Sequence, residues 1–208
     1  MTTTIHRKVL THLSDFRRAL KLWSDLNGDG LTVANVLMNA RLEERFVDHS
    51  DCWHPSLIDF ENLKEKYEEK MVERVQELKG NLEAILEKMR QQYLKIQTQV
   101  LRLEEARIRA CELYGQEFVY ERPLFRTCTL DKIAIYTQQI FSNYTRELEL
   151  KQSLVAKLAN ITEQEVGTVL LSAWLNQPFL DTSLEREFEE LIEVETNPIS
   201  PSAAGPET

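Results

Sequence analysis

The side chains of this chain that could bind a metal ion are concentrated in its first quarter, in two short stretches. The first reads DLNGDGLTVANV from residue 25, and it places Asp25, Asn27 and Asp29 at the first, third and fifth positions of a calcium-binding loop. Calcium needs six to eight oxygen ligands, and a Glu at the twelfth position normally supplies two of them. That position holds Val36, so the stretch has the turn and half of the ligands but not the clamp. Its Asn-Gly-Asp-Gly core is equally typical of a turn between two helices.

The second stretch, DHSDCWH at residues 48–54, holds the densest group of zinc-type ligands, namely Asp48, His49, Asp51, Cys52 and His54. Structural zinc sites usually take paired ligands from two separate places in the chain. No second pair exists, because the other two cysteines, Cys111 and Cys128, stand alone. The composition favours the alternative, a polar loop between helices with Trp53 packed against them.

The remaining polar residues form no pattern that indicates catalysis. The four histidines lie in the first quarter of the chain, and nothing in the sequence places one beside Cys111 or Cys128, as a cysteine nucleophile would require. The phosphate-binding patterns GxxxxGK(S/T) and GxGxxG are both absent. The sequence therefore predicts a protein that is not an enzyme and carries no cofactor.

The overall composition favours long helices in an all-α fold. Only six of the 208 residues are Gly and six are Pro, while 28% are charged. A formal net charge of −9 argues against direct nucleic-acid binding, which needs a basic surface. No apolar run approaches the ~20 residues that span a membrane, and the N-terminus lacks the apolar core of a signal peptide. Three widely spaced cysteines suit reduced thiols, so we expect a cytosolic or nuclear protein without membrane contact.

The N-terminal segment, residues 1–47, is predicted to be a helical hairpin. A first helix over about residues 5–26 carries an apolar stripe at steps of four and three, made of Val9, Leu13, Phe16, Leu20 and Trp23. The Asn-Gly-Asp-Gly turn ends this helix. Thr32 can then cap a second helix that runs to about Phe46.

Residues 57–113 contain no Pro and one Gly, and their apolar residues follow the seven-residue repeat of a coiled coil. The two seam positions of this repeat hold Met71, Val75, Leu78, Leu82, Ile85, Met89, Gln92, Ile96, Gln99, Leu103, Ala106, Ala110 and Leu113. The segment is either one continuous helix or a helix that bends at Gly80 and at the two seam glutamines.

Thr129 opens a second long helix over residues 129–161, which is the natural antiparallel partner of the first. Residues 48–161 are therefore predicted to form an elongated coiled-coil hairpin, with an aromatic connector at residues 114–128.

Residues 162–195 are predicted to form short C-terminal helices. Thr162 opens a capping box at the start of the first, and Thr182 or Ser183 starts the last. The tail, residues 196–208, is poor in bulky apolar residues and is predicted to be disordered.

Two segments are apolar where loops are usually polar, namely ERPLFRTC at residues 121–128 and LLSAWLNQPFLD at residues 170–181. Each surrounds a Pro that stops a helix. They either fold back as plugs against the helical hairpin or anchor a partner protein, since aromatic and Arg side chains dominate binding hot spots. The candidate partner-binding residues are Arg122, Pro123, Leu124, Phe125, Trp174, Leu175, Pro178 and Phe179.

The same segments carry a family resemblance. ACELYGQEFVYERPLFRTC, YTRELELKQSLVAKLA and LLSAWLNQPFLD, in this order, resemble the C-terminal half of the cyclin-dependent kinase 2-interacting protein family. Near the N-terminus, LKLWSDLNGDGLTVANVLMNAR resembles the opening helices of that family. The resemblance covers most of residues 5–195 and is most specific at RPLF, RELELK, VAKLA and WLNQPF.

This resemblance implies an adaptor without catalytic residues. Family members are described as binding cyclin-dependent kinase 2 and the Cdc7-type replication kinase, and as associating with replication-origin and DNA-damage checkpoint proteins. They are also described as subunits of an AAA+ ATPase complex that acts in ribosome maturation and at replication forks. A nuclear location with a second pool in the cytoplasm follows from the same resemblance.

Three hypotheses result from the sequence. The first is a helical adaptor whose seam packs partly within the chain and partly against protein partners, with self-association when it is alone. The second is a calcium- or zinc-responsive helical switch. The third is a homodimeric structural coiled coil.

Overall fold

The computed structural model describes residues 2–47, 53–58, 60 and 62–196, and these residues confirm an all-α fold. The helices are α1 (Thr2–Phe46), α2 (Pro55–Ile58), α3 (Leu63–Tyr114), α4 (Gln116–Tyr120), α5 (Leu130–Leu158), α6 (Gln164–Asn176) and α7 (Thr182–Thr196). No strand occurs between these helices within the described ranges. The predicted tail lies outside those ranges except for Thr196, which ends α7. The predicted division of the chain into domains stays a prediction.

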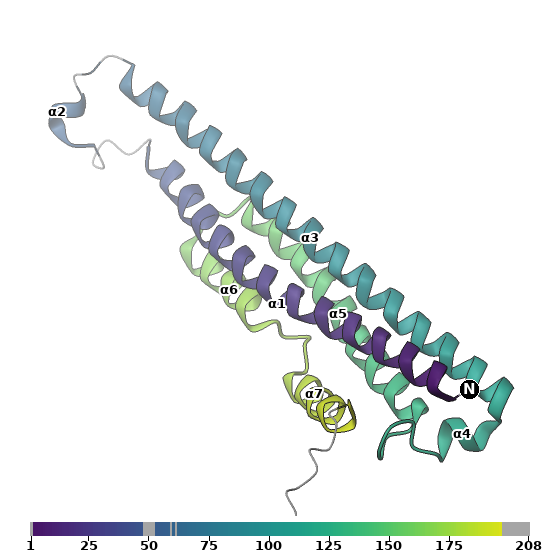
Figure 1. Ribbon diagram of the computed structural model, residues 1–208. Helices are drawn as coiled ribbons and strands as arrows, with labels where there is room; N and C mark the ends of the chain where they lie inside the picture. The colour runs from purple at the N-terminus through teal and green to yellow at the C-terminus, as the bar shows by residue number, and fades with distance from the viewer. Residues whose placement is uncertain (1, 48–52, 59, 61, 197–208) are drawn as a thin grey trace, which may run out of the picture.

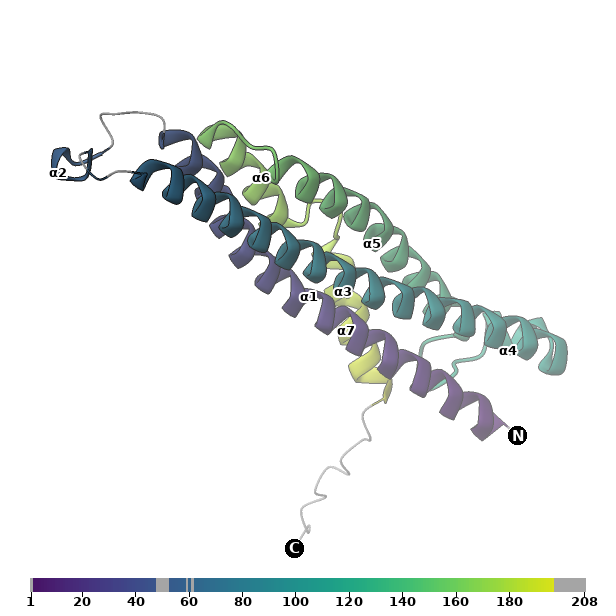
Figure 2. The ribbon, with the colours of Figure 1, turned by 90° about the horizontal axis from the view of Figure 1, so that it is seen from above.

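The two longest helices, α1 and α3, lie side by side and antiparallel in an elongated bundle (Figures 1 and 2). An ion pair joins them at one end, where Arg74 Nη1 of α3 lies 3.2 Å from Glu43 Oε2 of α1. Near the other end, His12 Nδ1 and Gln99 Oε1 are 3.0 Å apart. The main partner of α3 is therefore α1 rather than the predicted helix at residues 129–161, because an unbroken helix of 45 residues matches the length of α3 best.

The shorter helix α5 runs antiparallel to α3 along its C-terminal half (Figure 1). The rings of Tyr93 and Phe141 stack with centroids 5.3 Å apart, and Arg107 Nη1 lies 3.2 Å from Asp131 Oδ1 farther along. The predicted antiparallel pairing is present, but it is one face of a three-helix bundle and not a separate hairpin.

The seven-residue seam predicted for α3 is confirmed as its core face. Its buried members are Met71, Val75, Leu82, Met89, Gln92, Ile96, Gln99, Leu103 and Ala110. The helix is continuous through Gly80 and both glutamines over about 78 Å, at 1.5 Å per residue. The buried amide of Gln99 reaches His12, and that of Gln92 accepts a hydrogen bond from Lys95 at 3.3 Å.

The predicted N-terminal hairpin is wrong, because α1 runs unbroken through the Asn-Gly-Asp-Gly segment. Thr32 does not cap a second helix; its hydroxyl donates to the carbonyl of Gly28, one turn earlier, at 3.2 Å. Two glycines in a helix interior weaken it by roughly 1 kcal/mol each relative to Ala. Packing of α1 against α3 and α6 outweighs that local preference, as tertiary contacts often do.

Two of the three predicted helix starts after α3 are confirmed. Thr129 is the N-cap of α5, and its hydroxyl accepts from the Lys132 amide at 3.3 Å. The capping box at Thr162 is wrong, since Glu163 precedes α6 and makes no side-chain cap. The last helix begins at Thr182 as predicted, and the Asp181 carboxylate accepts from two amides of its first turn at 3.0 Å each.

The last helix, α7, lies against α1 and α5 near the middle of the bundle (Figure 2). Phe188 is fully buried and packs edge-on against Phe16 of α1, with ring centroids 5.6 Å apart. Its ring also lies 6.4 Å from that of Tyr136 on α5. None of the helices described here is both long and apolar enough to cross a membrane.

Candidate protein-binding site

Trp174, near the end of α6, is fully buried against the glycine-containing segment of α1. Its indole Nε1 donates to the main-chain carbonyl of Asn27 at 3.0 Å. A Cβ atom added to Gly30 would lie only 2.5 Å from Cζ2 of the same indole, closer than real Cβ atoms approach. The glycine that suggested a turn is therefore a notch in α1 that admits a tryptophan.

Beneath Trp174, α5 contributes a fully buried pair of opposite charges. Lys151 Nζ lies 3.3 Å from Glu147 Oε1, 4.5 Å from the centroid of the Trp174 ring, and it also donates to the Trp174 carbonyl. Glu147 Oε2 accepts from the Phe179 amide at 3.2 Å. Burial lowers the pKa of Lys151 to about 8, against the opposing effect of Glu147, and burial raises the pKa of Glu147.

The segment after α6 is fixed by a second tryptophan. Trp23 Nε1 of α1 donates to Gln177 Oε1 at 2.9 Å, and its ring packs edge-on against Tyr144 with centroids 5.1 Å apart. Gln177 takes the left-handed conformation, with φ 43° and ψ 64°, and so ends α6. We call Trp23, Asn27, Gly30, Glu147, Lys151, Trp174 and Gln177 the tryptophan junction.

The tryptophan junction directs the neighbouring apolar residues toward solvent. Leu175 is 56% exposed and Phe179 is 44% exposed, and Pro178 between them is exposed as well. Trp174 is a structural plug, whereas these three side chains form an apolar ridge on a rigid support. We call Leu175, Pro178 and Phe179 the outer ridge.

The other predicted segment, residues 121–128 at the end of the connector, is a tight turn. The Leu124 amide donates to the Cys128 carbonyl at 2.8 Å, and Leu124 is buried. Phe125 is half-buried beside His6 of α1, with ring centroids 5.5 Å apart. Pro123 is exposed, as is Arg122, which pairs with Glu117 at 2.9 Å.

The C-terminal end of α7 holds this connector through Glu195. Its carboxylate accepts from the amides of Arg126 at 2.7 Å and Thr127 at 3.1 Å, and from the Thr127 hydroxyl. Burial alone would raise the pKa of Glu195, but these hydrogen bonds lower it below its usual value. The two predicted segments thus lie at opposite ends of α7, about 22 Å apart at 1.5 Å per residue.

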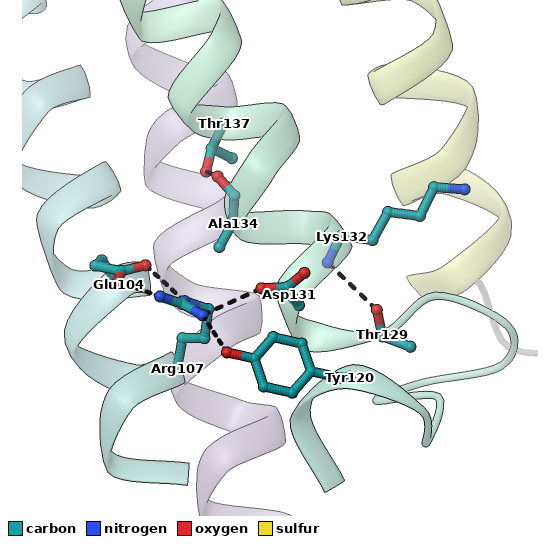
Figure 3. A network of polar contacts seen from close by, with 8 residues as sticks. All are labelled: Glu104, Arg107, Tyr120, Thr129, Asp131, Lys132, Ala134 and Thr137. Atoms are coloured by element: carbon teal, nitrogen blue, oxygen red, sulfur yellow. Dashed lines mark hydrogen bonds and ion pairs between the residues drawn. The ribbon is translucent and has the colours of Figure 1, made fainter. Parts of the chain in front are cut away.

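A polar cluster ties α3, α4 and α5 together beside the connector (Figure 3). Arg107 Nη2 lies 2.6 Å from Glu104 Oε1, and its Nη1 reaches both the Tyr120 hydroxyl at 2.9 Å and Asp131 Oδ1 at 3.2 Å. The hydrogen bonds to Glu104 raise the pKa of Arg107. One guanidinium thereby holds three helices in register.

The structure tests the calcium hypothesis, but most of the zinc-type stretch lies outside the described residues. Residues 25–36 are part of a regular helix, so they do not wrap around an ion as a calcium loop must, and the calcium-loop interpretation is wrong. Of the zinc-type stretch, only Trp53 and His54 lie among the described residues. Trp53 Nε1 donates to the Val47 carbonyl at 2.9 Å. Over the described ranges, no group of three or more His, Cys, Asp or Glu side chains could hold a metal ion.

Sequence reasoning missed the buried charge pair at the centre of the tryptophan junction. A signal for it exists: Lys151 follows Tyr144 by seven residues and precedes Leu158 by seven, so it occupies a core position of α5. A lysine at such a position indicates either a bend or a buried partner, and the carboxylate of Glu147 one turn earlier supplies that partner.

Comparison with known proteins gives one group of relatives. No protein-family profile matches the chain. The cyclin-dependent kinase 2-interacting protein of Homo sapiens is 25% identical over 193 residues, covering 89% of this chain and 87% of the relative. The protein of that name from Bos taurus is 26% identical over 178 residues (84% and 82%), and that from Xenopus laevis is 24% identical over 189 residues (89% and 86%). The resemblance predicted from the sequence is confirmed, and these relatives are named as interacting proteins rather than as enzymes.

Proposed function

We propose that this chain is a non-catalytic helical adaptor, a subunit that holds partner proteins within a larger assembly. The similarity to cyclin-dependent kinase 2-interacting proteins along nearly the whole chain supports this proposal. On the same basis a cyclin-dependent kinase is the first candidate partner. A Cdc7-type kinase, replication and checkpoint factors, and an AAA+ ATPase complex acting in ribosome maturation and at replication forks are the further candidates, in the nucleus with a cytoplasmic pool.

The observation that carries the proposal is the tryptophan junction with its outer ridge. Buried charges, two tryptophans and a glycine notch lock the segment after α6, and that rigid segment presents Leu175, Pro178 and Phe179 to solvent. Exposed aromatic and aliphatic side chains on a preorganised support are typical of binding hot spots. At the far end of α7, the connector adds exposed Arg122 and Pro123 to the candidate binding surface. Leu124 and Trp174 are buried and belong to the core.

A homodimer through the coiled-coil seam is a weaker candidate. The buried seam of α3 is covered by α1 and α5 of the same chain. This arrangement occupies the surface that a purely structural two-chain coiled coil would use.

Purification of the chain from cells, followed by mass spectrometry of its companions, tests the proposal. We expect a kinase or AAA+ ATPase subunits with the wild-type protein, and their loss from the variant Leu175→Asp/Phe179→Asp. A matched control, Leu22→Asp/Val72→Asp, changes two exposed apolar residues on α1 and α3 and should keep the companions. Stoichiometric ATPase subunits would indicate a dedicated subunit of a remodelling complex, and substoichiometric kinases a transient adaptor. A chain that purifies without any specific companion would refute the proposal.

A further inference from the structure

A groove of about 560 Å³ lies between the first turns of α1 and the last turns of α3. Its apolar surface comes from Ile5 on α1 and from Ala106 and Leu113 on α3. Leu113 occupies a seam position, yet it is 61% exposed. The seam of α3 thus changes from buried at Ala110 to exposed at Leu113 at this end of the bundle.

Three cations surround this groove. Lys8, Arg102 and Arg109 line it and are exposed, and none of them forms an ion pair within the described part of the chain. Glu105 is the one acidic residue of the lining. On the same helix, by contrast, Arg107 pairs with Glu104 and with Asp131. The lining of this groove therefore combines apolar surface with three unpaired cations and one carboxylate.

The apolar surface continues around α3. Leu101 and Ile108 are 58% and 49% exposed and lie seven residues apart, so they share one face of the helix. Ile108 lines a shallow surface together with Arg109 and Leu113, which also line the groove. The exposed face of α3 therefore extends over about three turns, or roughly 16 Å from Arg102 to Leu113.

We propose that this groove binds an acidic amphipathic helix of a partner protein, a proposal that rests on the adaptor function above. Apolar side chains at every third and fourth position of such a helix would pack on Ile5, Ala106 and Leu113. Its carboxylates would pair with the three cations, which have no intramolecular partner to give up. Nucleic acid fits less well, because phosphate binding gains nothing from exposed Leu101, Ile108 and Leu113.

A displayed library of random 16-residue peptides, selected on the full-length chain, tests this inference. We expect enriched peptides with net negative charge and apolar residues at helical spacing. They should bind Arg102→Glu/Arg109→Glu about tenfold or more weakly, because two attractive contacts become repulsive. The control Arg18→Glu/Lys88→Glu makes the same change of charge on exposed positions of α1 and α3 away from the groove, and it should bind within about twofold of the wild type. Circular dichroism must show both variants folded.

Several results would overturn the inference: no enriched peptide, enriched peptides without acidic character, or equal binding by the groove variant. Self-association that the groove variant abolishes, measured by sedimentation, would assign the groove to a second copy. Binding of single-stranded poly-uridine RNA that the groove variant abolishes would assign it to nucleic acid. Companions that still co-purify with Arg102→Glu/Arg109→Glu, when no peptide binds the wild type, would remove the groove proposal and leave the adaptor function standing.

Discussion

Replacing two neighbouring glycines of α1 by alanine should change stability in opposite directions. An added Cβ at Gly28 meets nothing within 4 Å, whereas one at Gly30 would lie 2.5 Å from Cζ2 and 3.2 Å from Cε2 of the buried Trp174 indole. The two positions share a helix and differ by two residues, so each variant is the control of the other.

The magnitudes follow from two opposing effects. Alanine in a helix interior is favoured over glycine by roughly 1 kcal/mol, so Gly28→Ala should raise the free energy of unfolding by up to about that amount. Gly30→Ala gains the same helix preference, but its methyl group would press against the fully buried Trp174 indole. Overpacking of this kind costs about 1–3 kcal/mol. The indole also has to keep its bond to the Asn27 carbonyl. We therefore expect Gly30→Ala to be about 1–3 kcal/mol less stable than Gly28→Ala.

Urea unfolding followed by circular dichroism at 222 nm measures both free energies. Gly80→Ala in α3, where an added Cβ also meets nothing within 4 Å, provides a second stabilised reference. A Gly28→Ala variant that is strongly destabilised would show that this segment is a turn and not a helix. A Gly30→Ala variant as stable as Gly28→Ala would show that Trp174 is not seated on this glycine.

Three further predictions concern buried charges. Lys151→Met should destabilise the fold by about 3–5 kcal/mol because it leaves Glu147 buried without its partner, whereas Glu147→Leu/Lys151→Met should recover much of that loss in the same urea assay. The free energy of unfolding of the wild type should rise, relative to Lys151→Met, by up to about 3 kcal/mol between pH 7 and 10. As the pH rises through this window the folded chain releases the Lys151 proton, at a pKa of about 8, while the unfolded chain still holds it. Glu195→Gln should lower the free energy of unfolding by about 1–2 kcal/mol at pH 7, because the hydrogen bonds to the carboxylate lose their charge. The difference in stability between wild type and variant should vanish as the pH falls from above 4.5 through the lowered pKa of Glu195, where the wild-type carboxylate also becomes neutral.

The long helix α3 was predictable because one rule governs it from end to end. A seven-residue apolar repeat must face a neighbouring helix, and every buried residue of α3 except Val100 occupies a position that the repeat selects. The choice of neighbour was not predictable from that rule. Both α1 and α5 carry an apolar stripe that could pack on the seam of α3. Helix α1 is the longer partner of α3 only because it does not break at residue 28.

The continuity of α1 depends on contacts that local sequence does not encode. Asn27, Gly28, Asp29 and Gly30 all disfavour a helix interior, so a turn was the physically sound expectation. The residue that reverses this preference, Trp174, lies 144 positions later, and its effect is visible only when α6 is packed on α1. The outer ridge has the same origin, since α6 must be placed before Leu175 and Trp174 can be assigned to opposite sides.

The glycine notch has a consequence for the chain during its synthesis. Residues 27–30 leave the ribosome 144 to 147 residues before Trp174, an interval of roughly 7–30 s at about 5–20 residues per second. Throughout that time the surface of α1 that will contact the Trp174 indole is uncovered. The Lys151 ammonium, once synthesised, also lacks its contact with the Trp174 ring. A chaperone or a nascent partner that recognises the unfilled notch can bind only in this interval. Once the tryptophan has closed, the same surface belongs to the interior, and assembly must proceed on the outer faces of the bundle.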